Sequence, residues 1–315
     1  MRDSEIQQRL EKRLGPLHAR QRLGIEADHE ARVFSGGSSL FHLENWYSFP
    51  SLIRFSLRMT GLHQRAIRNT LDLRVVEHRV ALPGLPPSLE GLRVLHLSDL
   101  HLDMNEDIVH VLIDRVRSAE YDLCVLTGDY RFRTFGEIGQ TVQRLAALRA
   151  SLSGDVFAVL GNHDSVTMLP AMEEMGIRVL MNESASFGEG DGRVYLAGID
   201  DAHYYGVGNI EKSLAGIPEA APTILLSHTP EVYRQAAHAG VHLLLCGHTH
   251  GGQICLPGGH PVILDARIPR RLGRGPWTYG NMRGYTSPGA GASILGVRLN
   301  CPPEITVHEL HTEDS

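Results

Sequence analysis

The stretch LRVLHLSDLH, residues 92–101, places an apolar run directly before an aspartate and a histidine. Four later stretches repeat this arrangement: DLCVLTGD (122–129), VFAVLGNHD (156–164), TILLSH (223–228) and HLLLCGHTH (242–250). Continuous apolar runs of this length are typical of strands that are buried on both faces of a sheet. Because ligands gather at the carboxyl ends of such strands, the five polar ends can converge on one site.

The apolar runs alternate with helix candidates at about 106–119, 135–150, 166–176 and 230–238. Further strand candidates lie at 72–80, 194–199 and 305–310. This alternation predicts an α/β fold, built as layers in the order α/β/β/α. We expect residues 91–315 to form the main domain and residues 1–90 to form an N-terminal helical extension.

Composition limits the possible partners. The chain has 315 residues, of which 42% are hydrophobic, and this is enough to bury a large core. The formal net charge of −6 divides into +3 for residues 1–90 (13 basic, 10 acidic) and −9 for residues 91–315 (17 basic, 26 acidic). An acidic main domain without an evident basic groove argues against nucleic acid as a partner.

The cysteines and the N-terminal segment bear on location. The four cysteines form no CxxC pair, so they fit a reducing compartment better than a disulfide scaffold. The first residues are too polar for a signal peptide, and no apolar stretch is long enough for a membrane span. We therefore expect a cytoplasmic protein, and peripheral attachment to the inner face of the cell membrane stays an open alternative.

The polar strand ends supply a set of metal-ligand types. The candidate ligands are Asp99, His101, Asp129, Asn162, His228, His248 and His250. Each motif alone is also compatible with a surface loop or a strand face, whereas the ordered set indicates a metal centre. Carboxylates, imidazoles and an amide oxygen suit Mn²⁺, Fe or Zn²⁺ better than Ca²⁺ or Mg²⁺. We expect two such ions with Asp129 between them, since a shared carboxylate offsets their repulsion and Gly128 permits a tight turn before it. Such a pair polarises a phosphoryl oxygen and generates a bridging hydroxide for in-line hydrolysis.

The ordered set DxH, GD, GNHD, H and GHxH resembles the calcineurin-like metallophosphoesterases over about residues 91–310. The longer string GHTHGGQICLPG (247–258) resembles a bacterial branch of membrane-attached phosphodiesterases and UDP-2,3-diacylglucosamine pyrophosphatases. The resemblance implies the four-layer sandwich of that family. It assigns one metal to Asp99, His101, Asp129 and His250, and the other to Asp129, Asn162, His228 and His248.

The resemblance also implies roles for the residues after Asn162. His163 would protonate the leaving oxygen as a general acid. Asp164 would orient a neighbouring imidazole, or alternatively cap the helix that follows it. In the protein-phosphatase members, a segment ending in Asp-Arg-Gly follows the GD motif; here the residues after Asp129 read YRFRT, which argues against a phosphoprotein phosphatase.

Three further residues are candidates for substrate contact. Arg131 and Arg133 could reach a substrate phosphate, or they could be solvated loop residues. His203, which follows two aspartates, could line the mouth of the site. The remaining histidines are expected to be ordinary surface or core residues.

The extension contains a candidate amphipathic helix at 51–69, after a polar segment at 1–30 (a helix or a mobile arm) and a break at 36–39. Its apolar face would hold Leu52, Phe55, Met59, Leu62, Ala66 and Ile67. The opposite face would hold Arg54, Arg58, Arg65 and Arg68, and Trp46, Tyr47 and Phe49 lie just upstream. This pattern is typical of a helix in a membrane interface, but a helix packed on its own domain would share it.

Two functional interpretations of the catalytic type follow, and one of another class. The chain would hydrolyse a phosphodiester or pyrophosphate bond in a small or lipid-linked phosphoester, or more narrowly UDP-2,3-diacylglucosamine in lipid A biosynthesis. An arginine cluster at Arg267, Arg270, Arg271 and Arg274 would bind an acidic headgroup or nucleotide phosphates, or it is a solvated loop. The alternative of another class is a non-catalytic binding module on the same fold.

Overall fold

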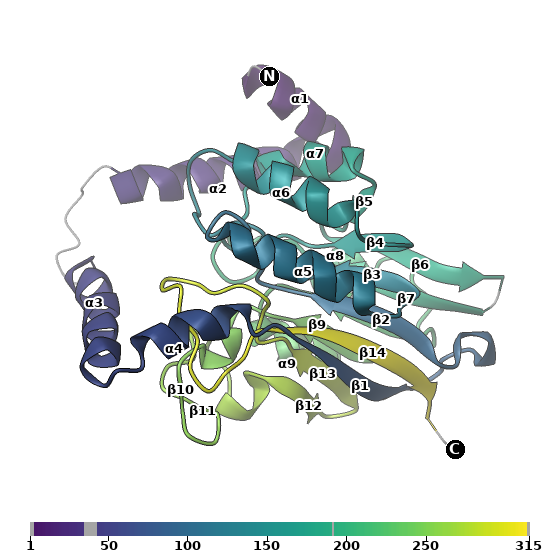
Figure 1. The fold of residues 1–315 in the computed structure, drawn as a ribbon. Helices are drawn as coiled ribbons and strands as arrows, with labels where there is room; N and C mark the ends of the chain where they lie inside the picture. Colours follow the sequence, from purple (N-terminus) through teal and green to yellow (C-terminus); the bar gives the residue numbers. More distant parts are fainter. Residues whose placement is uncertain (1–2, 35–42, 191, 314–315) are drawn as a thin grey trace.

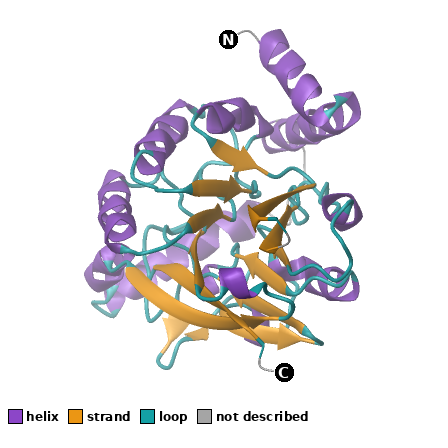
Figure 2. Ribbon diagram, turned by 90° about the vertical axis from the view of Figure 1, so that its right-hand side faces the viewer, coloured by secondary structure: helices purple, strands orange, loops and turns teal. Residues whose placement is uncertain are grey.

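The computed structural model describes residues 3–34, 43–190 and 192–313, with the backbone alone for residues 3, 34 and 43–50. The break expected at 36–39 lies outside the described residues, and so do the side chains of Trp46, Tyr47 and Phe49. The two sheets and their helical covers are drawn in Figure 1 and, turned by 90°, in Figure 2.

The first sheet contains six strands. In spatial order they are β1 (Arg74–Leu82), β14 (Glu304–Thr312), β2 (Leu92–Leu97), β3 (Leu123–Leu126), β4 (Asp155–Ala158) and β5 (Ile177–Val179). All neighbouring pairs are parallel except β14 and β2, which are antiparallel. The strands expected at 72–80 and 305–310 are therefore confirmed as the neighbours β1 and β14. Arg74 and its partner Glu304 are 230 positions apart in the sequence, and all strands of the second sheet lie between them along the chain.

The second sheet also contains six strands. They are β12 (Gly275–Tyr279), β13 (Met282–Thr286), β9 (Leu243–Cys246), β8 (Thr223–Leu226), β7 (Gly192–Gly198) and β6 (Glu183–Glu189). The strands expected at 194–199, 223–227 and 243–246 form its parallel centre. The apolar pattern did not predict the antiparallel hairpin β12–β13 at one edge of this sheet. It also did not predict strand β6, which pairs antiparallel with β7 at the other edge. A separate two-stranded ribbon pairs β10 (Cys255–Leu256) with β11 (His260–Pro261).

Alternate side chains of the strands face different cores, which confirms the layered design. In β2, Leu95 and Leu97 pack with helices α5 (Glu106–Ser118), α6 (Gly139–Arg149) and α7 (Leu169–Glu174). Leu92 and Val94 of the same strand pack with side chains of the second sheet. The outer face of that sheet is covered by α9 (Tyr233–His238), and α8 (Ile210–Leu214) lies at its margin. The fold is thus an α/β/β/α sandwich.

The first two helices pack on the sandwich. They are α1 (Asp3–Leu14) and α2 (Pro16–Phe34), and Leu10 and Ala19 are fully buried in the same core as β2. Residues 3–34 are therefore docked helices. The boundary expected at residue 90 separates strands of one sheet, because β1 precedes it and β2 follows it.

The single helix expected at 51–69 is wrong. The structure has two helices, α3 (Leu43–Met59) and α4 (His63–Arg68), which are separated by a turn at Gly61 with φ +70°. A positive φ is a conformation that glycine adopts readily, and it ends the first helix here. Within the described parts of the chain, no helix is both long and apolar enough to cross a bilayer.

Candidate metal centre

Five of the seven candidate ligands have a left-handed backbone. The φ values are +52° at Asp99, +44° at His101, +57° at Asp129, +70° at His248 and +50° at His250. Such a conformation costs residues other than glycine about 1–3 kcal/mol each when it is held by its surroundings, and it concentrates at functional sites. The strain lies at the strand ends that the sequence singled out, so these loops are shaped for something other than stability.

Two glycines allow the loops to approach each other. A Cβ atom at Gly161 would overlap Oδ1 of Asp129, and one at Gly247 would overlap the Ser98 hydroxyl and Oδ2 of Asp99. Neither position accepts a side chain unless the aspartate moves. The GNHD and GHTH motifs therefore begin with glycine because a carboxylate occupies that space.

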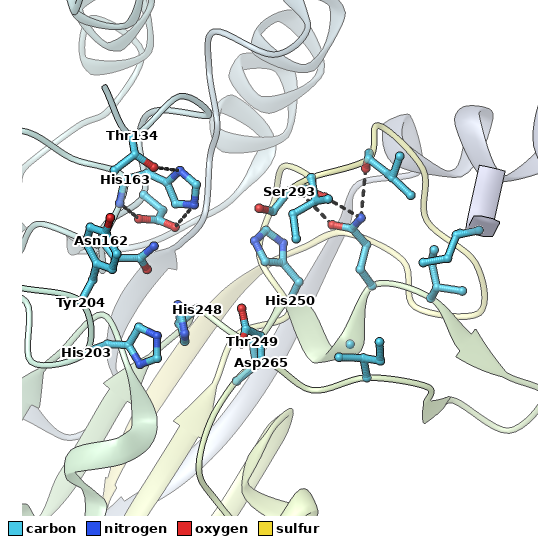
Figure 3. Close-up of a pocket in the computed structure, with 18 of the residues that line it drawn as sticks. Thr134, Asn162, His163, His203, Tyr204, His248, Thr249, His250, Asp265 and Ser293 are labelled. Carbon is cyan, nitrogen blue, oxygen red and sulfur yellow. Dashed lines mark hydrogen bonds and ion pairs between the residues drawn. The ribbon is translucent and has the colours of Figure 1, made fainter. Parts of the chain in front are cut away.

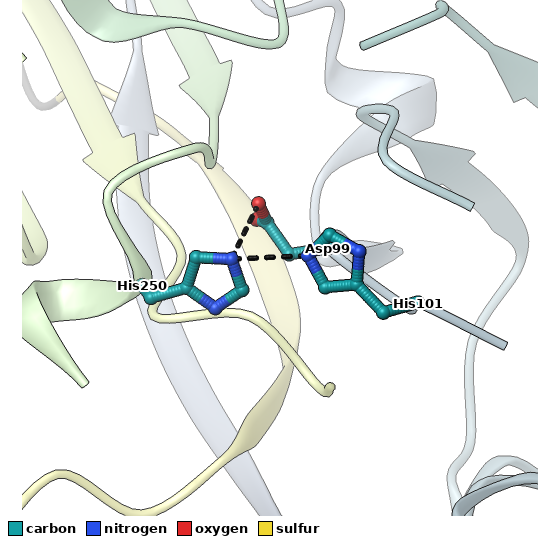
Figure 4. Close-up of side chains that lie close together, drawn as sticks. All are labelled: Asp99, His101 and His250. Carbon is teal, nitrogen blue, oxygen red and sulfur yellow. Dashed lines mark hydrogen bonds and ion pairs between the residues drawn. The ribbon is translucent and has the colours of Figure 1, made fainter. Parts of the chain in front are cut away.

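One group of candidate ligands comprises Asp99, His101 and His250, whose ligand atoms lie within 4.8 Å of one another (Figure 4). The Nε2 atoms of His101 and His250 face each other at 3.1 Å, and Nε2 of His250 lies 3.4 Å from Oδ1 of Asp99. Two neutral imidazole nitrogens at this distance both present lone pairs unless one carries a proton. A shared cation would satisfy both nitrogens and the carboxylate.

The second group comprises Asp99, Asp129 and His228. Nε2 of His228 lies 3.3 Å from Oδ2 of Asp129 and 2.9 Å from Oδ1 of Asn162. The ring of His248 lies 5.1 Å from that of His228, and its buried Nε2 has no hydrogen-bond partner among the described residues. A buried nitrogen without a partner is costly unless something outside the chain ligates it, so this donor set fits a metal ion.

Asp129 lies between the two groups. Its Oδ2 atom is 3.3 Å from Nε2 of His228 in one group and 4.0 Å from Nε2 of His101 in the other. The structure thus brings the seven candidate ligands close together. Asp99 belongs to both groups and Asp129 approaches an imidazole of each, so Asp129 as the shared ligand stays a prediction.

Electrostatics of the site favour bound positive charge. Burial would raise the pKa of Asp129, but the adjacent His228 and the other nearby imidazoles hold that pKa well below its usual range. Burial would lower the pKa of His228, yet the Asp129 carboxylate raises it to about 10. Burial raises the pKa of Asp99 to about 6. Two buried carboxylates therefore compete for cationic partners in a small volume.

Backbone carbonyls orient two of the imidazoles. Nδ1 of His101 lies 2.6 Å from the carbonyl oxygen of Arg131, and Nδ1 of His228 lies 2.8 Å from that of Thr127. A carbonyl accepts only, so each Nδ1 carries the proton and donates it. Each Nε2 then faces the centre. A metal ion bound there would take the place of any proton on this nitrogen.

Asp164 differs from both expectations. Its carboxylate accepts hydrogen bonds from the backbone N–H groups of Asp129, Tyr130 and Gly161 at 2.7, 2.9 and 2.8 Å, and not from an imidazole among the described residues. The capping alternative is wrong as well, because Ser165 occupies the N-cap and accepts from the N–H of Thr167. Asp164 fixes the loop of Asp129 against the loop that carries Asn162 and His163.

His163 lies beside the two groups without belonging to either. Its Nε2 atom is 3.9 Å from Oδ2 of Asp129, and its Nδ1 is 3.1 Å from the hydroxyl of Thr134. The side chain remains 22% exposed, so its ring is open to the cavity described below. The contact with Thr134 was not predicted, because nothing in the sequence links a threonine 29 residues away to this ring.

The three residues expected to contact substrate have different positions. Arg131 is only 1% exposed and donates to the carbonyls of Thr134 and Gly136, so its assignment as a phosphate ligand is wrong. Arg133 is exposed on the same loop, and its contact with substrate stays a prediction. The His203 ring lies 4.3 Å from the His248 ring, as expected at the mouth of the site. Its hydrogen bond to Glu231 raises its pKa.

Arg298 was missed from the sequence. It is fully buried and donates to the carbonyl oxygens of Pro288, Gly289 and Gly291 at 2.6, 3.1 and 2.8 Å. Its Nη2 atom also lies 3.2 Å from Nδ1 of His250. No motif marks it, since its role depends on carbonyls that only the folded loop brings together.

A cavity of about 600 Å³ opens from the metal-ligand side chains (Figure 3). One end is formed by Asn162, His163, His248 and His250. The other end is apolar and includes Ile53, Ile254, Val262, Ile263, Ile294 and Leu295. The cavity thus joins a polar reaction centre to an apolar chamber that helix α3 helps to line.

Comparison with known proteins finds a matching family model and relatives of similar sequence. The sequence model of the family described as calcineurin-like phosphoesterase matches residues 92–252. An uncharacterized metallophosphoesterase of Aquifex aeolicus is 30% identical over 76% of this chain and 92% of its own length. The phosphodiesterase YaeI of Escherichia coli is 28% identical over 75% of this chain and 87% of its own length.

Two further relatives differ in extent. A bovine transmembrane protein with a metallophosphoesterase domain is 30% identical over 72% of this chain, which spans about half (54%) of that relative. The solved calcineurin-like phosphoesterase YfkN of Bacillus subtilis has a TM-score of 0.43 and 17% identity, and the match covers 63% of this chain and 81% of that one.

Proposed function

Because the chain belongs to the calcineurin-like phosphoesterase family and is a metal-dependent phosphohydrolase, we propose that it cleaves a phosphodiester or pyrophosphate bond in a lipid-linked substrate. The observation that carries this proposal is the cavity, which has metal-ligand side chains at one end and an apolar lining at the other. A small polar phosphoester would leave the apolar end without a function.

Two divalent transition-metal ions, with Mn²⁺ as the first choice and Fe or Zn²⁺ as alternatives, are the proposed cofactors. Asp99, His101, Asp129 and His250 would hold one ion, and Asp129, Asn162, His228 and His248 would hold the other. This assignment is supported by the approach of Asp129 to an imidazole of each group and by the unpartnered Nε2 of His248. The metals, when bound, supply charge stabilisation at the phosphoryl oxygens and activate the attacking water.

His163 is the proposed general acid. Its ring reaches into the cavity from a loop fixed by Asp164, and the Thr134 hydroxyl holds its Nδ1 at 3.1 Å. This leaves Nε2 as the atom that gives a proton to the leaving oxygen. The role differs from that of the metal ligands, so it can be tested separately.

We predict that His163→Ala lowers kcat on the order of 10²-fold or more, because the leaving oxygen then departs without a proton. The metal content, measured by mass spectrometry of the purified protein, should stay at the wild-type level. His260→Ala, which removes an exposed histidine, is the matched control. Loss of metal from His163→Ala would contradict the assignment, whereas Asp129→Ala should empty the site.

The substrate class is tested with a homologous series. Methyl, butyl and octyl esters of p-nitrophenyl phosphate carry the same leaving group and differ only in apolar chain. A buried methylene contributes about 0.8 kcal/mol, so kcat/KM should rise up to about fourfold for each methylene that enters the cavity. Ile294→Ser should reduce the increase in kcat/KM for each added methylene and leave the rate on the methyl ester unchanged.

Two outcomes would overturn different parts of the proposal. Equal kcat/KM values for the methyl and octyl esters would exclude the lipid-linked substrate. No hydrolysis of any ester with Mn²⁺, Fe²⁺, Zn²⁺ or Mg²⁺ would favour a non-catalytic binding module. Release of UMP from UDP-2,3-diacylglucosamine tests the narrower candidate, which the apolar chamber also favours.

A lipid-linked substrate implies contact with a membrane. The face expected to be apolar is exposed in α3, where Leu52, Phe55 and Met59 are 59%, 61% and 71% exposed. The helix packs on the domain through Ile53 and Leu57 instead. We propose that the exposed side chains mediate peripheral attachment, whereas Arg267 and its neighbours at 270–274 stay candidates for substrate phosphate.

A further inference from the structure

A second pocket, of about 270 Å³, lies outside the metal centre between helices α3 and α4 and the segment 295–297 (Figure 1 shows both helices). Its polar lining consists of Arg54, Arg58 and His63. Leu57, Ile67 and the segment 295–297 complete the walls. The pocket therefore combines two guanidinium groups and an imidazole with an apolar floor.

The charge of this pocket is not neutralised locally. Residues 45–71 contain four arginines and no aspartate or glutamate. Among the residues that the structure describes, no carboxylate lies within ion-pair distance of Arg54 or Arg58. These two arginines are four residues apart on α3, so they project side by side and can engage one anion together.

The three sides of α3 have different surroundings. Successive residues turn by about 100° around a helix, so Ile53 and Leu57 form the side packed on Leu295 and Val297. Leu52, Phe55 and Met59 form the opposite side, which is exposed. Arg54 and Arg58 fall between these sides. This is the arrangement of a helix with its apolar side in the acyl region and its arginines at headgroup depth.

We propose that the pocket lined by Arg54, Arg58 and His63 binds the phosphate of an anionic phospholipid headgroup. Arginine suits this ligand because its guanidinium donates two parallel hydrogen bonds to phosphate oxygens. The occupant is a membrane lipid and not a free anion, since the three large apolar side chains exposed on the same helix need an apolar phase next to the pocket.

Headgroup binding has a consequence for the metal centre. Ile53 of α3 lines the active-site cavity, while Arg54 and Arg58 line the headgroup pocket. A lipid held at α3 therefore brings the leaflet against the apolar end of the cavity. This consequence rests on the lipid-linked substrate proposed above, whereas the headgroup pocket does not.

The experiment is co-sedimentation of the full chain with phosphatidylcholine vesicles that contain or lack phosphatidylglycerol. The double variant Arg54→Gln/Arg58→Gln should bind the phosphatidylglycerol vesicles on the order of tenfold more weakly than the wild type. Its matched control is Arg115→Gln/Arg117→Gln, which removes two exposed arginines from α5. Hydrolysis of the methyl ester should be the same in all three proteins, which separates this test from that of the proposed function.

Three results would overturn the proposal. One is failure of the wild type to bind phosphatidylglycerol vesicles. A second is an equal loss of binding in the α5 control, since this would reflect net charge and not the pocket. A third is calorimetric binding of inorganic phosphate by the wild type without any vesicle binding, which would assign the pocket to a soluble anion.

Discussion

The two helical pairs at the start of the chain, α1–α2 and α3–α4, use arginine in opposite ways. In α2, Arg22 is fully buried: its Nε atom lies 3.3 Å from Oδ1 of Asp200, and its guanidinium lies 3.5 Å from the centre of the Tyr205 ring. In α3, Arg54 and Arg58 are exposed beside a pocket without a carboxylate. The carboxylate partners of Arg22 come both from the main domain, at Asp200, and from its own helix, at Glu26. Helix α2 thus supplies an acidic partner of its own, whereas residues 45–71 contain no aspartate or glutamate.

The docked pair α1–α2 is connected to the metal centre by hydrogen bonds from α2. Nη2 of Arg22 donates to the carbonyl oxygen of Asp164 at 3.0 Å, and the Asp164 carboxylate fixes the backbone of Asp129. Glu26, one turn after Arg22, accepts from the N–H of Val166 at 2.7 Å. Helix α2 therefore supports the loops that hold the candidate ligands, although it lies outside the region of the motifs.

The largest expected effect comes from Arg22→Met, which keeps most of the side-chain length. It would leave the buried carboxylate of Asp200 without its guanidinium partner, at a cost of about 3–5 kcal/mol in the free energy of unfolding. Urea denaturation measures this cost. Arg20→Met removes an exposed arginine from the same helix and should have little effect. A similar cost for both variants would remove the distinction between the two helical pairs.

A smaller effect is expected at the side of α3 that is packed on the domain. Leu57 is 6% exposed and contacts Leu295 and Val297, so Leu57→Ala should lower the free energy of unfolding by about 2 kcal/mol. The measurement is again urea denaturation. If Leu57→Ala left the free energy of unfolding unchanged, the stability of the protein would not depend on this contact. This side of α3 would then not be a packing surface.

The docked pair should also respond to acid. Burial would raise the pKa of Asp200, but Arg22 and His18 hold it below its ordinary value of about 3.9. A depressed folded-state pKa contributes stability above that ordinary value, and the contribution is lost as pH falls through the folded-state pKa. The stability difference between the wild type and Asp200→Asn should therefore narrow below about pH 4. A difference that widens on acidification would show that Asp200 is not the stabilising partner.

The smallest effect on stability is expected at the exposed side of α3. Phe55→Ser should change the free energy of unfolding by no more than about 0.5 kcal/mol, because the ring is 61% exposed. The same variant should lose vesicle binding, and this combination would separate a binding surface from a packing surface. A large loss of stability would instead mean that the ring packs on the protein.

The metal centre could be predicted because each candidate ligand is marked by the residues next to it in the sequence. Each ligand directly follows an apolar strand, so the strand pattern and the motif order were sufficient to locate Asp99, Asp129 and His250. Arg131 was misassigned for the opposite reason: a loop that folds back on its own carbonyls buries the guanidinium, and no periodicity reports this. Arg298 depends in the same way on carbonyls of its own loop, at residues 288–291.

The fold could be predicted where strands lie within continuous apolar runs. Strands β5, β12 and β13 include glycine or alternate with arginine, so the apolar pattern did not distinguish them from loops. The amphipathic pattern at 51–69 was real, but the turn at Gly61 rotates the two halves relative to each other. For this reason, Ala66 is buried while Met59 is exposed, although both were assigned to one face.

The left-handed backbone occurs at Asp99, His101, Asp129, His248 and His250. Selection for activity and selection for thermal stability should therefore favour different residues at these positions. At each of these positions glycine would adopt the same conformation without strain, and replacing a buried charge or an unpartnered imidazole would remove a further cost. A library selected for heat resistance alone should therefore accumulate substitutions at these ligands early. The most intolerant positions for catalysis would then be among the most permissive for folding.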